Sequence, residues 1–398
     1  MQMDHHTFGN SYDVVIVGGG PAGASAAYCL AAAGVKAAVL EKSPLPRYKT
    51  CGGGIVRRGL RSLPIAIGDA VERECFMAEI HLHDAGLRFE TRRQVPIVSM
   101  TMRDRFDHLL LSAAREAGAD IACCEVLDVY PHSERVDLLT SHGPLCARFV
   151  IAADGALSTV ARKTNWPDNR PLIPALEYEV TVDDSLLARF SQSARFDFGV
   201  VPCGYGWVFP KKEHLSIGVF TLRRGGANLN EEFHSYLRLL GIAQAPRMER
   251  HGSLIPVTIR RAPFAIGRIL LVGDAAGFVD PLTGEGISFA IQSGQIAARS
   301  LVGGNLAAQE VSHRYNADIA AGILPELRAA KILSRLLYHH PALRSLFFRL
   351  YGQRFSEVVT DIMAGERTYR GVMGNPSNYS ELFRVVGERV KTTVAGRI

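Results

Sequence analysis

Apolar residues in this chain gather into short runs that end at glycine or at an acid, and each run precedes a helical pattern. The first run, residues 14–17, stops at Gly18, and an alanine-rich segment follows from Pro21. The next run ends at Glu41. Unbroken β-branched runs are typical of strands buried on both faces, so this alternation predicts an α/β fold with a parallel sheet.

Two later segments repeat the strand-then-glycine form. One predicted strand ends before Asp154 and Gly155, and another ends before Gly273 and Asp274. After the second, apolar residues return with a helical period, at positions 287, 290, 291, 294, 298 and 301. These segments predict one sheet assembled from distant parts of the chain.

Apolar and polar residues alternate in the middle of the chain. Residues 175–182, 195–202 and 204–222 predict antiparallel strands, and residues 79–92 predict a hairpin that turns near Gly86. Further on, residues 323–351 have the pattern of two helices. A basic face on the first is typical either of a helix lying on a membrane or of a packed helix with one solvated side, and we favour the packed helix.

Three glycines, Gly18, Gly20 and Gly23, form a GxGxxG motif between the first strand and the helix that opens at Pro21. Such glycines let backbone N–H groups approach a pyrophosphate at the helix N-terminus. Glu41 ends the second strand, where a carboxylate binds a ribose hydroxyl. The arrangement predicts a dinucleotide site and argues against a glycine-rich turn without a ligand.

These patterns predict three parts of the chain. A discontinuous Rossmann-type domain binds the cofactor, an antiparallel sheet domain for the substrate is inserted into it, and a helical region ends the chain. The cofactor domain comprises residues 11–66, 97–174 and 262–310. The inserted sheet domain comprises residues 67–96 and 175–261, and the helical region comprises residues 311–398.

A second glycine cluster, RYKTCGGGI at residues 47–55, follows Glu41 closely. Glycine lacks a side chain, so this loop is expected to lie close to the cofactor. Arg47 and Lys49 flank Cys51 and are expected to favour its thiolate form. From composition alone, a flexible loop with an incidental thiol is the simpler interpretation.

Composition narrows the class of protein without selecting one. Of 398 residues, 47% are hydrophobic and 21% are charged, which suits a large core, and the formal net charge of +6 is mild. A net charge this mild does not by itself indicate a nucleic-acid partner, so we expect none. The charge fits an anionic ligand or a membrane surface equally well. Seven cysteines without metal-ligand spacing predict free, mostly buried thiols and no metal site. The first ten residues lack a secretory signal pattern, so we expect a cytoplasmic protein.

Several of these motifs together resemble the geranylgeranyl reductase family, within the flavoprotein superfamily of the aromatic hydroxylases. YKTCGGGI at 48–55 is similar to the family's cysteine–glycine signature, and GYGWVFPK at 204–211 to its Tyr-x-Trp-x-Phe-Pro segment. GDAAGFVDPLTGEGI at 273–287 is similar to its third cofactor motif, with Gly277 where the hydroxylases usually carry histidine. The resemblance implies a hydroxylase-like FAD domain and an enzyme that saturates isolated double bonds of prenyl chains.

The resemblance also implies the site residues. Cys51, Tyr205 and Trp207 are expected to act in catalysis, with Cys51 or Tyr205 as a candidate acid. Tyr205 and Trp207 alternate on one strand and so share a face, where plain core packing is an equally good interpretation. The residues expected to bind FAD are Gly18, Gly20, Pro21, Ala22, Gly23, Glu41, Cys51, Gly52, Gly54, Arg103, Leu127, Asp154, Gly155, Asp274, Gly284, Gly286 and Ile287.

The electron donor and the substrate are less sharply indicated. No second GxGxxG motif is present, so we expect NADPH to bind only transiently, or a reduced protein to donate the electrons. The implied substrate is a prenyl lipid in the form of a free diphosphate, a chlorophyll-type ester or an ether lipid. Peripheral contact with a membrane fits such a substrate.

Two other functions stay open. Flavin-dependent monooxygenases and halogenases share the fold, and the halogenase segment Trp-x-Trp-x-Ile-Pro half matches YGWVFP, although Tyr205 and Phe209 depart from it. A stable flavin–oxygen adduct would identify that class. Prenyl-protein escort proteins share the fold without flavin chemistry, and a colourless purified protein would favour them.

Overall fold

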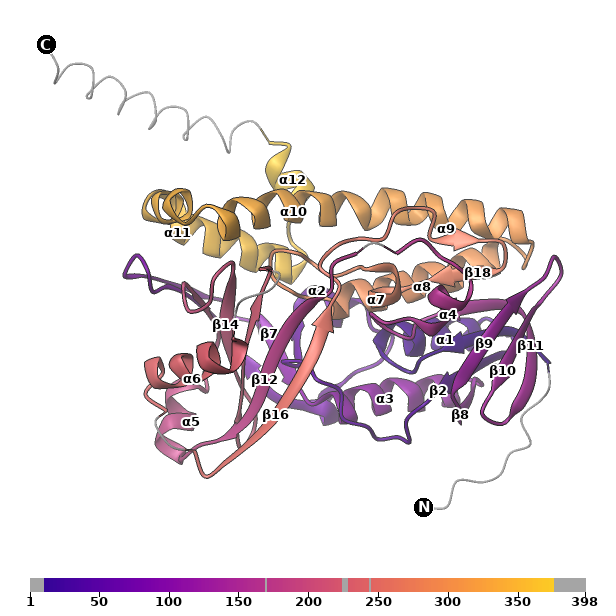
Figure 1. Cartoon of the computed structure of the whole chain (residues 1–398), viewed down its shortest axis with the longest axis horizontal. Helices are drawn as coiled ribbons and strands as arrows, with labels where there is room; N and C mark the ends of the chain where they lie inside the picture. Colours follow the sequence, from indigo (N-terminus) through magenta and orange to yellow (C-terminus); the bar gives the residue numbers. More distant parts are fainter. Residues whose placement is uncertain (1–10, 169, 224–227, 243–244, 376–398) are drawn as a thin grey trace, which may run out of the picture.

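In the computed structural model, two large sheets lie side by side and a layer of helices crosses one side of both (Figure 1). The structure describes residues 11–168, 170–223, 228–242 and 245–375. The α/β architecture predicted from the apolar runs, with an inserted sheet and a helical C-terminal region, is confirmed, although residues 376–398 of the predicted helical region lie outside the described residues.

The first sheet is the parallel core. β1 (Ser11–Val17) lies between β2 (Ala37–Glu41) and β11 (Gly143–Ala152), and both neighbours run parallel to it. Because β1 is covered on both faces, its apolar run is almost wholly buried. The remaining strands of this sheet are β8 (Asp120–Cys123), β9 (Val126–Pro131), β10 (Val136–Thr140), β17 (Ala265–Ile266) and β18 (Ile269–Leu271).

A helix rich in small residues packs on this sheet, and a second such helix packs closely on the first one. α1 (Pro21–Ala32) contacts α8 (Ile287–Gly303), where a Cβ on Gly294 would lie 2.1 Å from the backbone oxygen of Ala22. Glycine at 294 therefore lets the two backbones touch. The other helices of this domain are α2 (Arg57–Ser62), the 3₁₀ turn η1 (Gly68–Ala70), α3 (Arg103–Glu116), α4 (Thr159–Lys163) and α7 (Gly273–Ala276).

The second sheet has seven strands, ordered β16-β12-β15-β14-β13-β5-β6. Its neighbouring pairs are antiparallel, as predicted, except that β13 runs parallel to β5. Its strands are β5 (Met77–Leu82), β6 (Leu87–Arg92), β12 (Ile173–Thr181), β13 (Ser193–Phe198), β14 (Gly204–Pro210), β15 (Leu215–Thr221) and β16 (Arg247–Ile255). Helices α5 (Asp184–Phe190) and α6 (Leu229–Leu239) cover one face of this sheet, and the opposite face is turned toward the first domain.

A small third sheet joins the two large ones. β7 (Val98–Thr101) lies between β3 (Gly54–Val56) and β4 (Val71–Cys75). β4 falls inside the predicted insertion at 67–96, yet it pairs with β7 from the cofactor domain. The predicted domain boundaries therefore stay a proposal.

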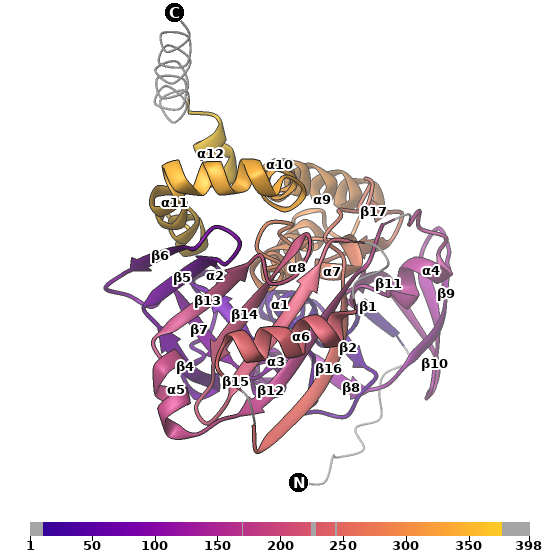
Figure 2. The ribbon, with the colours of Figure 1, turned by 60° about the vertical axis from the view of Figure 1, so that its left-hand side comes forward.

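The C-terminal helices connect the two domains, as Figure 2 shows from the side. One helix packs on α8 and another on β5 and β6. The break predicted near Pro341 separates the second and third of these helices. They are α9 (Ala308–Gly322), α10 (Leu324–His339), α11 (Pro341–Ala364) and α12 (Tyr369–Met373). Among the described residues, no helix is both long and apolar enough to cross a membrane.

The cysteines differ from their predicted burial. All seven are free thiols, but only Cys75 and Cys124 are buried. The others are half-buried or exposed because they lie on outer strands, in loops or on a partly covered helix face.

Candidate functional site

The turn after β1 is shaped by two glycines and left open by a third. Gly18 has φ +102°, and a Cβ there would lie 2.4 Å from the backbone oxygen of Ala153; a Cβ on Gly23 would lie 2.0 Å from the oxygen of Gly18. At Gly20 the nearest atom is a guanidinium nitrogen of Arg103, 3.7 Å away. No side chain caps α1, so its first backbone N–H groups remain free to bind an anion.

Glu41 lies where its spacing predicted, facing this turn. The carboxylate is buried, and Oε2 accepts hydrogen bonds from the backbone N–H of Gly19 (2.9 Å) and from Arg47 (3.1 Å). The other terminal nitrogen of Arg47 donates to Asp107 at 2.9 Å. The predicted role of Arg47 beside the Cys51 thiol is therefore wrong, because its guanidinium lies between two carboxylates instead.

The cation beside Cys51 is Arg103, from the start of α3. Its guanidinium donates two hydrogen bonds, both 2.8 Å, to the fully buried carboxylate of Asp107. Burial alone would lower the pKa of Arg103, but Asp107 and Cys51 together hold it above its usual value. Asp107 was missed in the sequence, although its position four residues after Arg103 on a predicted helix indicates an ion pair.

Two further acids line the same groove. Burial raises the pKa of Asp274, while the nearby cations Lys49, Arg103 and Arg170 favour its charged form. Burial also raises the pKa of Asp154, whose Oδ2 accepts from the backbone N–H of Val160 at 3.1 Å. The other oxygen, Oδ1, is buried without a hydrogen-bond partner in the described part of the chain.

Asp154 follows β11 and Asp274, on α7, follows β18, while the glycine turn follows β1; these three strands are parallel neighbours in the first sheet. The carboxyl ends of such strands meet at one edge, which is where ligands bind in open α/β sheets. Gly155 in the same region has φ +82° and open space around its missing Cβ. Leu127 lies instead on β9 with a 44% exposed side chain, and its contact with a cofactor stays a prediction.

The three glycines of the Cys51 loop allow other parts of the protein to pack closely against the loop backbone. A Cβ on Gly52 would lie 2.8 Å from the Phe209 ring, and one on Gly54 would lie 3.1 Å from Val98. Gly53 has φ +65°, and its Cβ would lie 2.0 Å from the backbone oxygen of Thr101. The glycines were predicted to allow a close cofactor, whereas the missing side chains face β14 and β7.

Lys211 fixes the backbone of this loop through hydrogen bonds. It is fully buried at the end of the GYGWVFPK segment, and its Nζ donates to the backbone oxygens of Gly52 (2.7 Å) and Thr101 (3.0 Å). Burial lowers the pKa of Lys211, although nearby carboxylates favour its charged form. Sequence analysis gave this lysine no role, and a charged residue closing an apolar strand is the signal that it missed.

Tyr205 and Trp207 share one face of β14, as predicted, and both are buried. Tyr205 donates a hydrogen bond to the backbone oxygen of Thr283. The Trp207 indole lies across Gly218 of β15, where a Cβ would be 2.1 Å from its ring. Its Nε1 has no hydrogen-bond partner among the described residues.

Three tyrosines from different elements hold the segment before α8. Besides Tyr205, Tyr338 of α10 donates to the backbone oxygen of Leu282 (2.5 Å), and Tyr369 of α12 donates to Asp280 (2.8 Å). This segment leads into Gly284, Gly286 and Ile287, which were predicted to bind the cofactor. The C-terminal helices therefore fix a loop of the groove as well as covering the sheets.

The N-terminus of α8 already has a carboxylate near it. Glu285 accepts from the backbone N–H of Ser288 at 2.7 Å and pairs with Arg58 at 2.8 Å. Gly286, the N-cap residue, would place a Cβ 3.5 Å from Asp274 Oδ1. The helix end and the acid of the third motif thus lie next to each other.

A small apolar cavity lies between the second sheet and α11, with Tyr205 in its wall. Aromatic residues of β13 and aliphatic residues of β5 form one side, α11 forms the other, and the loop at 282–283 closes one end. Its lining residues are Ala78, Ile80, Phe196, Phe198, Tyr205, Leu282, Thr283, Phe355, Ser356, Val359, Thr360 and Met363.

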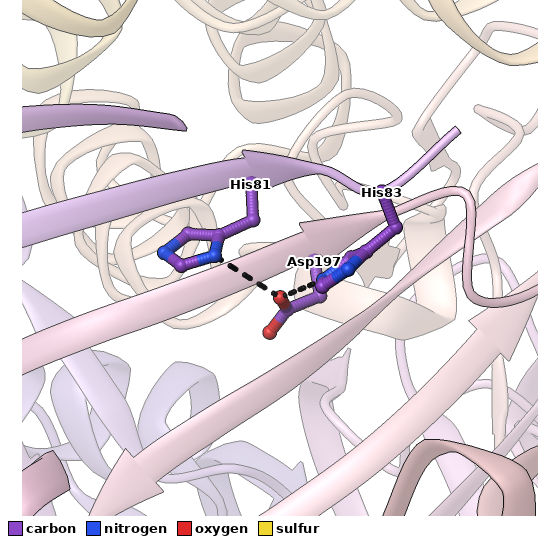
Figure 3. Close-up of side chains that lie close together, drawn as sticks. All are labelled: His81, His83 and Asp197. Carbon is purple, nitrogen blue, oxygen red and sulfur yellow. Dashed lines mark hydrogen bonds and ion pairs between the residues drawn. The ribbon is translucent and has the colours of Figure 1, made fainter. Parts of the chain in front are cut away.

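A polar cluster occupies the opposite face of the same sheet (Figure 3). The fully buried carboxylate of Asp197 lies 2.6 Å from His83 Nε2 and 3.9 Å from His81 Nδ1. Both of its oxygens already accept from Arg195, at 2.8 and 2.9 Å, and one also accepts from Tyr236 at 2.5 Å. A metal ion would have to displace that guanidinium, so the geometry favours a hydrogen-bonded charge cluster.

Comparison with known protein families agrees with the cofactor groove. Residues 11–303 match the family model described as an FAD binding domain. Digeranylgeranylglycerophospholipid reductase 2 of Methanothermobacter thermautotrophicus is 31% identical over 351 residues, which cover 82% of this chain and 88% of that protein. The chloroplastic geranylgeranyl diphosphate reductase of Oryza sativa is 28% identical over 424 residues, which cover 98% of this chain and 88% of that protein.

Solved structures share the fold. A geranylgeranyl bacteriochlorophyll reductase-like protein from Thermoplasma acidophilum has a TM-score of 0.74 at 24% identity, over 94% of this chain and 98% of that one. A flavin-dependent brominase has a TM-score of 0.71 at 20% identity, over 96% of this chain and 100% of that one. Since a reductase-like protein and a brominase both match, the fold does not decide the reaction.

Proposed function

This chain belongs to the geranylgeranyl reductase family of FAD-binding flavoproteins, and from that premise we propose that it saturates isolated double bonds of a prenyl chain. The observation that carries the proposal is the apolar cavity at Tyr205. Its lining is apolar, as the end of a hydrocarbon tail requires, and Trp207 and the Cys51 loop lie further along β14, beyond the cavity itself.

The residues of the groove fit FAD. The open turn at Gly20 and the uncapped start of α1 suit a pyrophosphate, and Glu41 suits the ribose hydroxyls. The unpartnered oxygen of Asp154 and the open space at Gly155 leave further room for a ligand. When bound, FAD supplies the two electrons that the reduction needs.

The chain itself supplies a proton and an apolar surface. Saturating an unactivated double bond needs one proton in addition to a hydride, which carries the two electrons and the first hydrogen, and a positioned acid contributes about 10²–10⁴-fold to such a step. Cys51 is the first candidate because Arg103 lies against its thiol. Tyr205 is the second, since it lines the cavity, although burial raises the pKa of its hydroxyl.

An anaerobic experiment tests the function directly. The purified, yellow protein is reduced chemically and mixed with geranylgeranyl diphosphate, and mass spectrometry follows the products. We expect flavin reoxidation together with products two mass units heavier for each reduced bond. A colourless protein would favour an escort function, and a stable flavin–oxygen adduct in air would favour a monooxygenase or halogenase.

Cys51→Ser and Cys51→Ala separate a chemical role of the thiol from a structural one. Both variants should keep FAD and lose about 10²-fold or more of the prenyl-reducing rate, with Cys51→Ala at least as impaired. Cys203→Ser, at another half-buried thiol, is the matched control. Parent rates and an unchanged product pattern in both Cys51 variants would show that the thiol has no chemical role.

NADPH as the electron source belongs to the same proposal. Because no second GxGxxG motif provides a nicotinamide domain, we expect weak or undetectable binding of NADPH without turnover. Calorimetry on the oxidised holoprotein measures this. A tight, stoichiometric NADPH complex would contradict it.

Peripheral contact with a membrane is also proposed, from the surface of α10 and α11. Ile332, Leu343 and Leu346 are exposed apolar residues, and Arg328 and Arg335 are exposed on the same pair of helices. Apolar and basic side chains together suit anionic lipid headgroups. We expect co-sedimentation with phosphatidylglycerol vesicles and much less with phosphatidylcholine vesicles; no difference between them would count against this surface.

A further inference from the structure

One sheet face at the Cys51 loop carries two acids that the function described above does not use. Glu177 and Glu179 lie two residues apart on β12, and Glu177 is almost wholly buried. Glu177 is opposite Gly218 on β15, and Gly218 is opposite Trp207 on β14. Directly opposed residues share a face, so Glu177 faces the same space as Trp207, with no side chain between them.

Glu177 contacts the loop that carries the candidate acid. Its carboxyl group lies near the backbone N–H of Cys51, which favours the ionised form of Glu177. It also lies 3.1 Å from the hydroxyl of Tyr48, whose ring stacks on His251 with centroids 4.1 Å apart. Tyr48 is 39% exposed, so this contact runs from solvent to a buried carboxyl group beside Cys51.

One hydroxyl, that of Tyr48, lies between the two carboxyl groups, and a single proton shared by that pair would satisfy both contacts. This hydroxyl lies 3.1 Å from Glu177 and 3.2 Å from Glu179. A phenol has one proton and donates to only one acceptor. The second close contact is a hydrogen bond only if that carboxyl group is protonated and donates to the phenol oxygen. Two ionised carboxylates around one hydroxyl would instead leave an unpaired, repulsive contact.

The surroundings place the shared proton on Glu177. Burial and the adjoining Glu179 raise the pKa of Glu177 to about 8. Burial also works against ionisation of Glu179, but the ion pair with His214 at 3.1 Å lowers its pKa. The charged or titratable groups around Glu177 are Tyr48, Cys51, Glu179, Lys211 and His251.

Two buried nitrogen atoms on the same face have no hydrogen-bond partner among the described residues. They are Nε1 of Trp207, a side chain that is only 7% exposed, and Nε2 of His251. The indole nitrogen of Trp207 is always an N–H, and a buried N–H without an acceptor is costly, so it indicates that an acceptor binds there. This face is therefore incomplete without a ligand or water, unlike the saturated Asp197 cluster on the opposite face.

We propose that Glu177 stores the proton consumed in the reduction, acts through Cys51, and is recharged from solvent through Tyr48. The inference rests on the proposed reductase function. When bound, reduced FAD would supply the two electrons and one hydrogen, and the Cys51 thiol would give the second carbon its proton. The O–H bond of Glu177 then breaks and the thiol S–H bond forms again. Tyr48 passes a proton to the Glu177 carboxylate and takes one from water.

Glu177→Gln tests this proposal, because glutamine keeps the size and the polar contacts but does not titrate. In the anaerobic reaction of reduced protein with geranylgeranyl diphosphate at about pH 7, we expect a rate lower by roughly 10²-fold. The parent rate should fall as the pH rises through the pKa of Glu177, and the variant should lack that fall. Glu79→Gln, on the opposite face of the sheet, should keep the parent rate and profile.

Infrared spectroscopy gives a readout that does not depend on turnover. The parent protein should show the C=O band of a protonated carboxylic acid near neutral pH, and this band should disappear as the pH rises through about 8. The component of this band that titrates near pH 8 should be absent from Glu177→Gln and present in Glu79→Gln, because His81 and Ser193 hold the pKa of Glu79 at about 2 despite its burial.

The outcomes separate this inference from the proposed function. If the parent protein does not reduce the prenyl substrate, the proposed function fails, and the infrared band alone decides whether Glu177 stores a proton. If the parent protein is active, either of two results overturns the inference. The first is a Glu177→Gln variant with the rate and pH profile of the parent protein. The second is a titrating carboxylic acid band that Glu177→Gln keeps.

Tyr48→Phe covers the case in which Glu177→Gln fails to fold, because it keeps the exposed ring and removes only the hydroxyl. Slower reduction that small buffer acids accelerate supports the proton path. The parent rate at every buffer concentration overturns it.

Discussion

The turn at residues 18–23 and the loop at residues 52–54 are both glycine clusters beside one groove. Gly20 of the turn differs from every glycine of the loop in the space that its missing side chain leaves, whereas Gly18 and Gly23 lie against the protein as the loop glycines do. At Gly20 a Cβ would meet nothing closer than 3.7 Å. In the loop, every missing Cβ would lie 3.1 Å or less from another part of the protein. A glycine cluster therefore shows that something approaches the backbone, and only the fold tells whether this is a ligand or the chain itself.

The largest expected effect comes from filling the space at Gly53. Gly53→Ala adds strain at φ +65° and a collision with the Thr101 oxygen, so we expect a loss of about 2–4 kcal/mol in the free energy of unfolding. Gly34→Ala is the matched control, since φ is +75° and nothing lies within 4 Å. It should cost only about 1 kcal/mol. Equal losses in denaturant unfolding would show that the close packing does not matter.

A smaller effect, on ligand affinity, is expected at the first cluster. Glu41→Ala removes a charged acceptor that faces the turn, so FAD binding should weaken by about 1.5–3 kcal/mol. Flavin titration of the apoprotein measures this, and Glu116→Ala, at an exposed position on α3, is the control. An unchanged affinity would remove Glu41 from the cofactor site.

The smallest effect on stability is expected at Gly20. Gly20→Ala places a methyl group in open space, so the free energy of unfolding should change by less than about 0.5 kcal/mol while FAD binds more weakly. Thermal unfolding of the apoprotein and flavin titration separate these two quantities. A large loss of stability with unchanged FAD affinity would reverse the contrast with Gly53.

The parts of the molecule that follow local rules could be predicted from sequence. The GxGxxG turn and Glu41 were predictable because a strand, a tight turn and a helix fix the relative positions of nearby residues. The break at Pro341 is local in the same way. The parallel pairing of β13 with β5 was not predictable, because the alternation of apolar residues is the same in parallel and antiparallel strands of a half-buried sheet.

Ion-pair partners depend on the whole fold and were not predictable from neighbours in the sequence. Arg47 is four residues from Cys51, yet it pairs with Asp107, sixty residues away. Glu177 is similar: an acid in an alternating strand normally faces solvent, and only the packing of the Cys51 loop on β12 makes that face buried.

The three tyrosine hydroxyls on residues 280–283 have a consequence for how the two ligands influence each other. The segment that they hold leads to the predicted flavin loop on one side and closes the apolar cavity on the other. A ligand that orders this segment lowers the entropy cost of ordering it for the second ligand. We therefore expect FAD and an apolar ligand in the cavity to strengthen each other's binding, and thermodynamic reciprocity requires the same factor in both directions, with the C-terminal helices as the element that couples the two ligands.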